Sequence, residues 1–251
     1  MNKKCAYITE VFSSIQGEGL LCGERHIFVR FAGCGLGCRY CDTPDAFGKP
    51  GNCAVERRGG SGIFRNEPNP VGVEALAGMV QDLNTPQGLH HALALTGGEP
   101  LEQGDFLVEF IPAVKPNRMR ILLETNGTLP DCLERIIDLV DIISADFKIE
   151  SSTGLPPKYD ESRRFLEIAL RKPTYIKIVV TSETTTAEIE DAAGIIASVN
   201  PAIPVILQPV TPPEKQIPQP VSRILVLQEA AGRHLAAVRV IPQMHNILGL
   251  K

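Results

Sequence analysis

Three cysteines, Cys34, Cys38 and Cys41, are the residues whose type and spacing point most directly to chemistry. Thiolates at such short intervals suit an iron–sulfur cluster or a zinc ion. The glycines between and beside them let the backbone fold tightly around a compact group. A cubane [4Fe-4S] cluster usually takes four cysteines. Three would leave one iron open to a substrate or cofactor.

Zinc is the main alternative on spacing alone. A zinc site would need a fourth ligand, which Cys22 or Cys53 could supply. A plain electron carrier would prefer four cysteines and needs no barrel around it. The spacing therefore favours an open iron–sulfur cluster, with a zinc or electron-transfer module as the non-enzymatic alternative.

Composition narrows the class of protein. The 251 residues are 43% hydrophobic and 22% charged, which is ordinary for a globular chain. With no Trp, 5% aromatic residues and a net charge of −4, the chain lacks the features that nucleic-acid binding needs. No apolar run reaches membrane-span length, and no apolar signal core follows the first five residues. We expect one cytoplasmic domain over residues 1–251 that binds neither nucleic acid nor membrane and keeps its thiols reduced.

Short apolar runs alternate with amphipathic stretches along the chain. The runs predict strands at 27–31, 93–95, 121–123, 142–143, 176–180, 205–207 and 238–241. The amphipathic stretches predict helices at 73–83, 105–114, 131–140, 162–171, 187–199 and 221–237. This alternation predicts a parallel sheet with right-handed crossovers, as in α/β barrels. Residues 48–70, rich in Gly and Pro, predict a loop insertion.

Polar residues follow nearly every predicted strand. They include Thr96-Gly97-Gly98-Glu99, Glu124-Thr125-Asn126, Asp146-Phe147-Lys148 and Gln208-Pro209. In parallel α/β barrels, active sites assemble at the carboxyl ends of the strands. We therefore expect these side chains and the cysteine loop to share one site.

The cysteine motif, with Tyr40 before its last member, resembles the signature of radical S-adenosylmethionine (SAM) enzymes. The run Thr96-Gly97-Gly98-Glu99-Pro100 resembles the SAM-binding strand end of that superfamily. The resemblance implies a partial (β/α)6 TIM barrel, possibly with one extra C-terminal strand. It also implies a [4Fe-4S] cluster on Cys34, Cys38 and Cys41, with SAM as the second cofactor.

Further segments resemble one family, the 7-carboxy-7-deazaguanine synthases of queuosine biosynthesis. They are residues 10–19 (with the run QGEG), 30–34, 41–43, 124–128, 208–212 and 243–251. The resemblance implies a lyase that converts 6-carboxy-5,6,7,8-tetrahydropterin to 7-carboxy-7-deazaguanine by radical ring contraction and loss of ammonia. It also implies Mg²⁺, a homodimer and a reductant such as flavodoxin or ferredoxin.

The same resemblance assigns roles residue by residue. The hydroxyl of Thr43 would bind Mg²⁺, and Arg30 would grip the substrate carboxylate, as a bidentate guanidinium can. The other implied substrate contacts are Ile15, Gln16, Gly17, Thr96, His245 and Lys251. The implied SAM contacts are Tyr40, Gly98, Glu99, Glu124, Asn126, Ser144, Asp146, Lys148, Gln208, Pro209, Val210 and Thr211. Whether Ser144 or Asp146 contacts SAM stays open, because some family members carry Ser-Pro-Lys there.

A second enzyme class shares the cysteine loop and the Gly-Gly-Glu turn. Activating enzymes for glycyl radical proteins act on a protein substrate, and many carry a cysteine-rich, ferredoxin-like insert. No such insert occurs in this sequence, whose remaining cysteines, Cys5, Cys22, Cys53 and Cys132, match no ligand position. The segment around Gln16 and Glu18 also favours the small pterin substrate.

Overall fold

The computed structural model describes residues 4–41, 43, 47–115, 119–211 and 220–250. Its strands are β1 (Cys5–Ala6), β2 (Ile8–Ile15), β3 (Arg25–Phe31), β4 (Asn52–Glu56), β5 (Phe64–Pro68), β6 (Val71–Gly72), β7 (Ala92–Gly97), β8 (Arg120–Thr125), β9 (Ile142–Asp146), β10 (Thr174–Val180), β11 (Val205–Pro209) and β12 (Val238–Val240). Its α-helices are α1 (Val73–Leu83), α2 (Gly104–Val114), α3 (Pro130–Ile136), α4 (Glu150–Thr153), α5 (Tyr159–Ala169), α6 (Thr186–Val199), α7 (Val221–Gly232) and α8 (Met244–Leu248).

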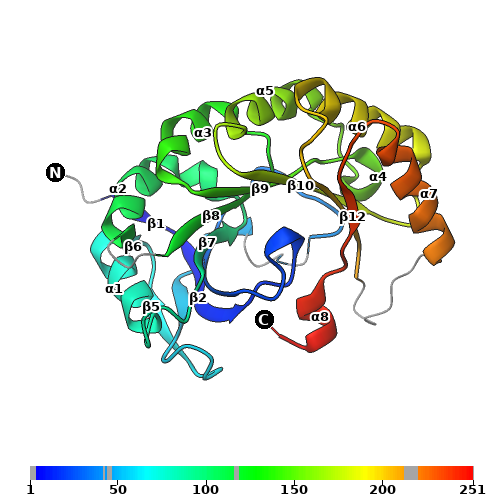
Figure 1. Cartoon of the computed structure of the whole chain (residues 1–251). Helices are drawn as coiled ribbons and strands as arrows, with labels where there is room; N and C mark the ends of the chain where they lie inside the picture. Colours follow the sequence, from blue (N-terminus) through cyan, green and yellow to red (C-terminus); the bar gives the residue numbers. More distant parts are fainter. Residues whose placement is uncertain (1–3, 42, 44–46, 116–118, 212–219, 251) are drawn as a thin grey trace.

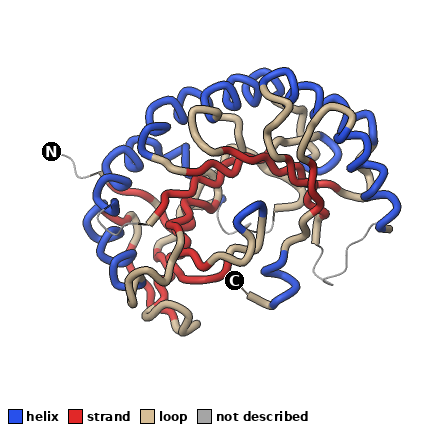
Figure 2. Tube along the Cα trace, in the orientation of Figure 1, coloured by secondary structure: helices blue, strands red, loops and turns tan. Residues whose placement is uncertain are grey.

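Ten strands of the described residues form one sheet in the order β12-β11-β10-β9-β8-β7-β3-β2-β4-β5. Neighbours from β3 to β12 are all parallel. The sheet curves into an open arch with helices along its outer side (Figures 1 and 2). The partial barrel is confirmed, and β12 is the additional C-terminal strand. Each of the seven predicted strands is present, because strands buried on both faces read as continuous apolar runs.

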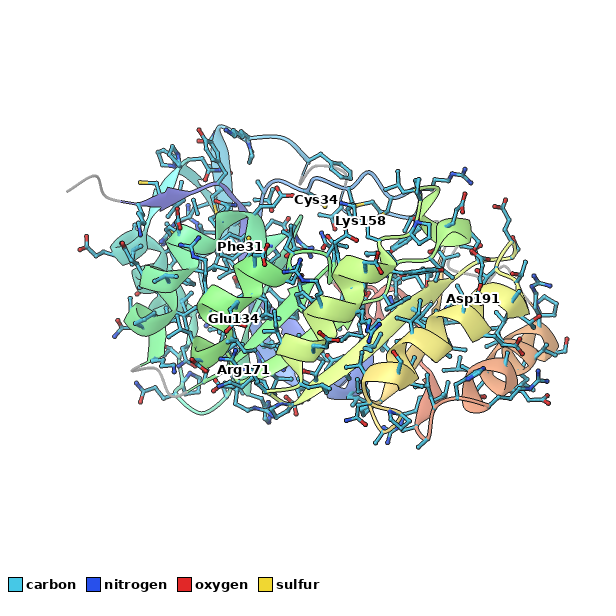
Figure 3. All side chains as sticks on the ribbon, turned by 90° about the horizontal axis from the view of Figure 1, so that it is seen from above. Phe31, Cys34, Glu134, Lys158, Arg171 and Asp191 are labelled. Atoms are coloured by element: carbon cyan, nitrogen blue, oxygen red, sulfur yellow. The ribbon has the colours of Figure 1, made fainter. Side chains whose placement is uncertain are left out.

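The core lies between the outer face of the sheet and the helices. Phe31 of β3 packs edge-on against Phe106 of α2, with ring centroids 6.3 Å apart, and Phe106 stacks on Phe110 at 5.5 Å. Burying one such side chain contributes about 1.5–3 kcal/mol. A second cluster packs β10 and β11 against α6 and α7. Exposed ion pairs such as Arg171 with Glu134 lie outside these clusters (Figure 3).

The N-terminal part of the sheet differs from the prediction. Strand β2 pairs antiparallel with β3, and residues 48–70 contain the hairpin β4–β5, which extends the sheet beyond β2. The prediction of a loop for this segment was wrong. Gly and Pro are frequent there, but Cys53 and Val55 among them are fully buried. The Glu56 carboxylate also accepts hydrogen bonds from the backbone N–H groups of Ser13 and Gly62, which closes the hairpin onto β2.

The loop after β2 and the C-terminal helix α8 meet at the open side of the arch (Figure 1). The backbone N–H of Met244 in α8 donates to the carbonyl of Gly17, 2.9 Å away. Helix α7 ends at Gly232, before the predicted residue 237, because the chain turns there toward β12. In the part of the chain that the structure describes, no helix has the length and apolarity to cross a membrane.

Candidate functional site

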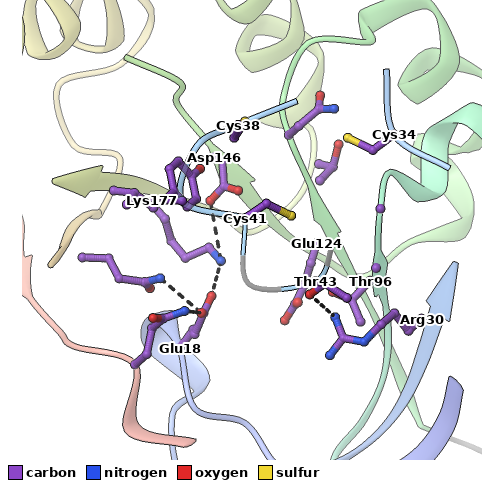
Figure 4. Close-up of a pocket in the computed structure, with 18 of the residues that line it drawn as sticks. Glu18, Arg30, Cys34, Cys38, Cys41, Thr43, Thr96, Glu124, Asp146 and Lys177 are labelled. Atoms are coloured by element: carbon purple, nitrogen blue, oxygen red, sulfur yellow. Dashed lines mark hydrogen bonds and ion pairs between the residues drawn. The ribbon is translucent and has the colours of Figure 1, made fainter. Parts of the chain in front are cut away.

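Strand register places a ring of polar side chains on the concave face of the sheet. Lys177 of β10 pairs in register with Asp146 of β9, and Arg30 of β3 with Thr96 of β7. Because parallel strands all present their carboxyl ends at one edge, these side chains converge. They line a cavity of about 1160 Å³, including solvent at its mouth. Predicted residues at its wall are Ile15, Gln16, Gly17, Arg30, Cys34, Cys38, Tyr40, Cys41, Thr43, Thr96, Gly98, Glu124, Asn126, Asp146, Lys148, Gln208 and His245 (Figure 4).

The cysteine loop leaves β3 and is held by the turn after β7. The backbone N–H of Glu99 donates to the Gly33 carbonyl at 2.7 Å. A β-carbon at Gly98 would lie 2.0 Å from that carbonyl oxygen, so the two backbones touch. Gly33 itself has φ +97°, a conformation that favours glycine. This contact carries the three free thiols to the mouth of the pocket.

The thiols fit a cluster in type and number, and all three line the same pocket. Burial raises the pKa of Cys34 and of Cys38, so iron binding would release protons there. No three His, Cys, Asp or Glu side chains of the described residues already converge on one metal position. Gly37, which has open space around it, allows the loop to draw the sulfurs together.

Glu99 is placed differently from the predicted SAM contact. Its carboxylate is fully buried and accepts hydrogen bonds from Leu101 N–H, Thr125 Oγ1 and Asn126 N–H at 2.7–3.1 Å. Burial raises the pKa of Glu99 to about 7. Glu99 therefore lies behind the pocket wall and fixes the loop that carries Asn126.

A chain of charged groups crosses the pocket. The ammonium of Lys148 lies 2.5 Å from Tyr40 Oη and 2.8 Å from Asp146. Lys177 follows, 3.6 Å from Asp146 Oδ1 and 2.5 Å from Glu18 Oε2. Burial alone would raise the pKa of Glu18, but Lys177 and the neighbouring donors hold it at about 2. Burial opposes charge on Lys177, yet the carboxylates of Asp146 and Glu18 raise its pKa well above the usual value. Glu18 and Lys177 are therefore a buried ion pair.

Two buried acceptors in this wall have no hydrogen-bond partner among the described residues. They are Asp146 Oδ1 and Gln208 Oε1. Leaving a buried polar atom unpaired costs about 1–3 kcal/mol, so both atoms suit a ligand with N–H or O–H donors. SAM, with its amino and hydroxyl groups, fits this wall.

The opposite wall carries Arg30. Its Nη1 donates to Thr43 Oγ1 at 3.3 Å, while its Nε lies 3.6 Å from Glu10. The guanidinium also lies over the Phe12 ring, 5.9 Å from the centroid. Phe12 stacks on Phe28 at 5.2 Å, and both rings line the pocket. A fixed cation thus sits beside a flat apolar surface.

The N-terminal loop and the C-terminal segment complete the enclosure. Gln16 Nε2 donates to Glu124 Oε1 at 2.6 Å, linking the loop after β2 to β8. His245 lies against Gly17, where a β-carbon would be 2.4 Å from His245 Nδ1.

Some predicted contacts lie elsewhere. Ser144 is buried beneath the pocket beside Tyr175, and Pro209, Val210 and Thr211 do not line the pocket among the described residues. Among the described residues, strand β11 delivers only Gln208 to the wall, while the Val210 N–H donates to the Val180 carbonyl and continues the ladder with β10. Lys251 lies outside the described residues.

Sequence reasoning missed other lining residues. Those with polar side chains are Glu18, Lys177, Thr125 and Gln243, and those with apolar ones are Phe12, Phe28, Leu36, Phe47 and Val179. Lys177 could have been found from the sequence, because it is the one charged residue in the apolar run 176–180.

Comparison with known proteins agrees with this geometry. The Radical SAM superfamily profile matches residues 28–196. The 7-carboxy-7-deazaguanine synthase of Geobacter sulfurreducens is 44% identical, with 99% of each chain covered. That of Methanothermobacter thermautotrophicus is 38% identical, with 98% of each covered. The crystal structure of QueE from Escherichia coli shares the fold at TM-score 0.61 and 19% identity, over 96% of this chain and 95% of that one. The chain therefore belongs to the radical SAM superfamily and, within it, to the 7-carboxy-7-deazaguanine synthase family.

Proposed function

We propose that this protein is a 7-carboxy-7-deazaguanine synthase, a carbon–nitrogen lyase. It converts 6-carboxy-5,6,7,8-tetrahydropterin to 7-carboxy-7-deazaguanine, with ring contraction and loss of ammonia, in queuosine or 7-deazapurine biosynthesis. The observation that carries the proposal is one pocket with three thiols at its mouth and Arg30 beside stacked aromatic rings on its wall. That combination suits a flat heterocycle bearing a carboxylate.

Cys34, Cys38 and Cys41 would hold the [4Fe-4S] cluster, and Asn126, Asp146 and Gln208 would hold SAM. When bound, the two cofactors supply an electron and a carbon-centred radical that removes hydrogen from the substrate. The protein's own part is to hold the reacting carbon close and to exclude water. Asp146 Oδ1 and Gln208 Oε1, each without a donor within hydrogen-bond distance among the described residues, would accept hydrogen bonds from SAM.

The substrate carboxylate binds Arg30. Glu10 lies at the Nε side of the guanidinium, and the Nη side lies toward Thr43. A Mg²⁺ ion at Thr43 would bind the same carboxylate, because Mg²⁺ prefers oxygen ligands and keeps several waters. Arg30 and the ion together would hold the carboxylate in one orientation.

The pterin ring packs against the Phe12–Phe28 pair, beside the guanidinium that lies over the Phe12 ring. Gln16, the Gly17 backbone, Thr96 and His245 surround its edge. The Gln16–Glu124 hydrogen bond of 2.6 Å fixes the amide that would read the ring. Polar groups fixed in this way give specificity, because an analogue lacking their partners leaves them unpaired. Lys251, two residues beyond Gly249 and outside the described residues, is a further proposed substrate contact.

The proposed activity also implies partner proteins and a cellular setting. We infer an external reductant such as flavodoxin or ferredoxin, a homodimer, and a reducing cytoplasmic setting that keeps the seven free thiols reduced. Exposed apolar side chains on α7, namely Val221, Leu225 and Val226, support self-association.

The test is a product assay. Anaerobically reconstituted protein is incubated with SAM, reductant and 6-carboxytetrahydropterin, with and without Mg²⁺, and the products are identified by mass spectrometry. We expect 7-carboxy-7-deazaguanine, with a higher rate when Mg²⁺ is present. SAM cleavage with no deazaguanine would overturn the proposal and favour activation of a protein substrate.

A further inference from the structure

Lys177 is a buried charge in an otherwise apolar strand. Its neighbours Ile176 and Ile178 are fully buried in the outer core, while the Lys177 side chain points to the pocket and is 8% exposed. A buried ammonium is costly unless it is paired. A lysine at this position therefore has a specific partner to hold.

That partner is Glu18, in the loop after β2. Lys177 Nζ donates to Glu18 Oε2 at 2.5 Å. The other oxygen, Oε1, accepts from Gln208 Nε2 at 3.1 Å and from Gln243 Nε2 at 2.9 Å. Asp146 supports Lys177 from the other side at 3.6 Å. Both oxygens of Glu18 are thus occupied by protein donors (Figure 4).

These bonds join segments far apart in the sequence. Gln243 is followed by Met244 and His245. The Met244 N–H donates to the Gly17 carbonyl, and His245 packs on Gly17. The C-terminal segment reaches the barrel wall through Glu18, and Glu18 is anchored to the wall by Lys177. Without the ammonium, a carboxylate in this buried place would lose its strongest partner.

We propose that Lys177 is a positioning residue for the substrate end of the pocket. By binding Glu18 it holds Gln243 and His245 against Gly17, and so fixes the wall formed by the loop after β2 and the C-terminal segment. This inference rests on the proposed function for its kinetic readout. Lys177 acts through Glu18, without contacting the reacting atoms.

The test compares Lys177→Met, Glu18→Gln and the double variant with the reconstituted wild-type protein. Lys115→Met, exposed at the end of α2, is the matched control. The first readout is amide hydrogen exchange of residues 241–250, measured without substrate. The second is the KM for the carboxypterin, and the third is SAM cleavage without substrate.

We expect exchange of the C-terminal segment to quicken about tenfold in Lys177→Met and in Glu18→Gln, corresponding to about 1.4 kcal/mol. KM should rise at least about tenfold, since displaced positioning groups cost up to about a hundredfold. SAM cleavage without substrate should change less than KM does, because Lys148 still pairs with Asp146. The double variant should be no worse than Glu18→Gln, and Lys115→Met should match wild type in all three readouts.

Wild-type exchange in Lys177→Met, or additive effects in the double variant, would overturn the inference. If Lys177→Met fails to fold, Glu18→Gln is compared with the double variant instead. Neither of these two proteins has a buried Glu18 carboxylate without its ammonium partner, so their comparison still tests the role of Lys177. If the wild-type protein makes no deazaguanine, the proposed function fails, while the exchange data still judge the role of Lys177.

Discussion

Gly17 and His245 are in direct contact across the mouth of the pocket. A β-carbon on Gly17 would lie 2.4 Å from His245 Nδ1 and 2.6 Å from the His245 backbone nitrogen. The loop after β2 and the C-terminal segment therefore form one wall, although 228 residues separate them in the sequence. Substrate would bind inside this wall.

Gly17→Ala should open this wall. The added methyl cannot be accommodated by a side-chain shift alone, because the His245 backbone is also in the way. We expect KM for the carboxypterin to rise about tenfold or more, with iron content unchanged. Gly78→Ala, at a position in α1 with open space, is the control and should leave KM unchanged. An unaltered KM in Gly17→Ala would show that the wall does not shape the substrate site.

Gly98→Ala should impair the cysteine loop. Its β-carbon would fall 2.0 Å from the Gly33 carbonyl, a backbone atom held by the Glu99 N–H. We expect less than half of the wild-type iron per chain after reconstitution. Gly104→Ala, where a β-carbon meets nothing within 4 Å, should load normally. Full iron content in Gly98→Ala would mean that the loop binds the cluster independently of this turn.

The sequence predicted six of the parallel strands because most of their residues are buried on both faces, and the edge strand β12 because Val238 and Val240 flank one exposed residue. It missed β2 because polar residues interrupt the run Ile8–Ile15, which instead drew notice as a motif. The hairpin β4–β5 was missed because its buried residues, Cys53 and Val55, stand among Gly and Pro, and its closure depends on the distant Glu56–Ser13 bond.

The residues of the candidate site also form two groups, one that the sequence predicts and one that it does not. Thr96, Glu124 and Asp146 could be predicted because polar residues at parallel strand ends must converge, whereas Arg30 was implied by the family resemblance. The partners of Glu18 could not be predicted. They depend on how β10, β11 and the segment before α8 fold over the N-terminal loop, and no local pattern records such a contact.

Arg30→Lys should weaken substrate binding specifically. A lysine keeps the charge but loses the planar pair of donors that grips a carboxylate. A charge-assisted hydrogen bond contributes about 1.5–3 kcal/mol, so KM should rise about 10- to 100-fold while SAM cleavage without substrate persists. The control is Arg65→Lys in the β4–β5 hairpin, which pairs with Glu67. Equal KM values for the two variants would contradict the carboxylate role of Arg30.

The fold should lose stability in mild acid through His90. Its Nε2 lies 2.8 Å from Ser13 Oγ and its Nδ1 3.2 Å from Asn84 Oδ1. Burial lowers the pKa of His90 to about 4, from an ordinary value of about 6.5. Between pH 6.5 and 4 the unfolded chain binds a proton that the folded chain does not, so the His90 contribution is present above pH 6.5 and is lost as the pH falls.

Urea unfolding of His90→Gln at pH 7 and pH 5 checks this. The free energy of unfolding should fall less between the two values than in wild type. His91→Gln, at an exposed neighbouring histidine, should keep the wild-type slope. If His90→Gln loses as much stability as wild type on acidification, another group carries the acid sensitivity.

Electron paramagnetic resonance of the reduced, anaerobically reconstituted protein, recorded before and after adding SAM, tests the central claim most directly. Three cysteine ligands leave one iron for SAM, so we predict about four irons per chain and a changed spectrum when SAM is added. Cys38→Ala should lose that signal, whereas Cys132→Ala, which lies outside the pocket lining, should keep it. A wild-type spectrum that SAM leaves unaltered would contradict the account.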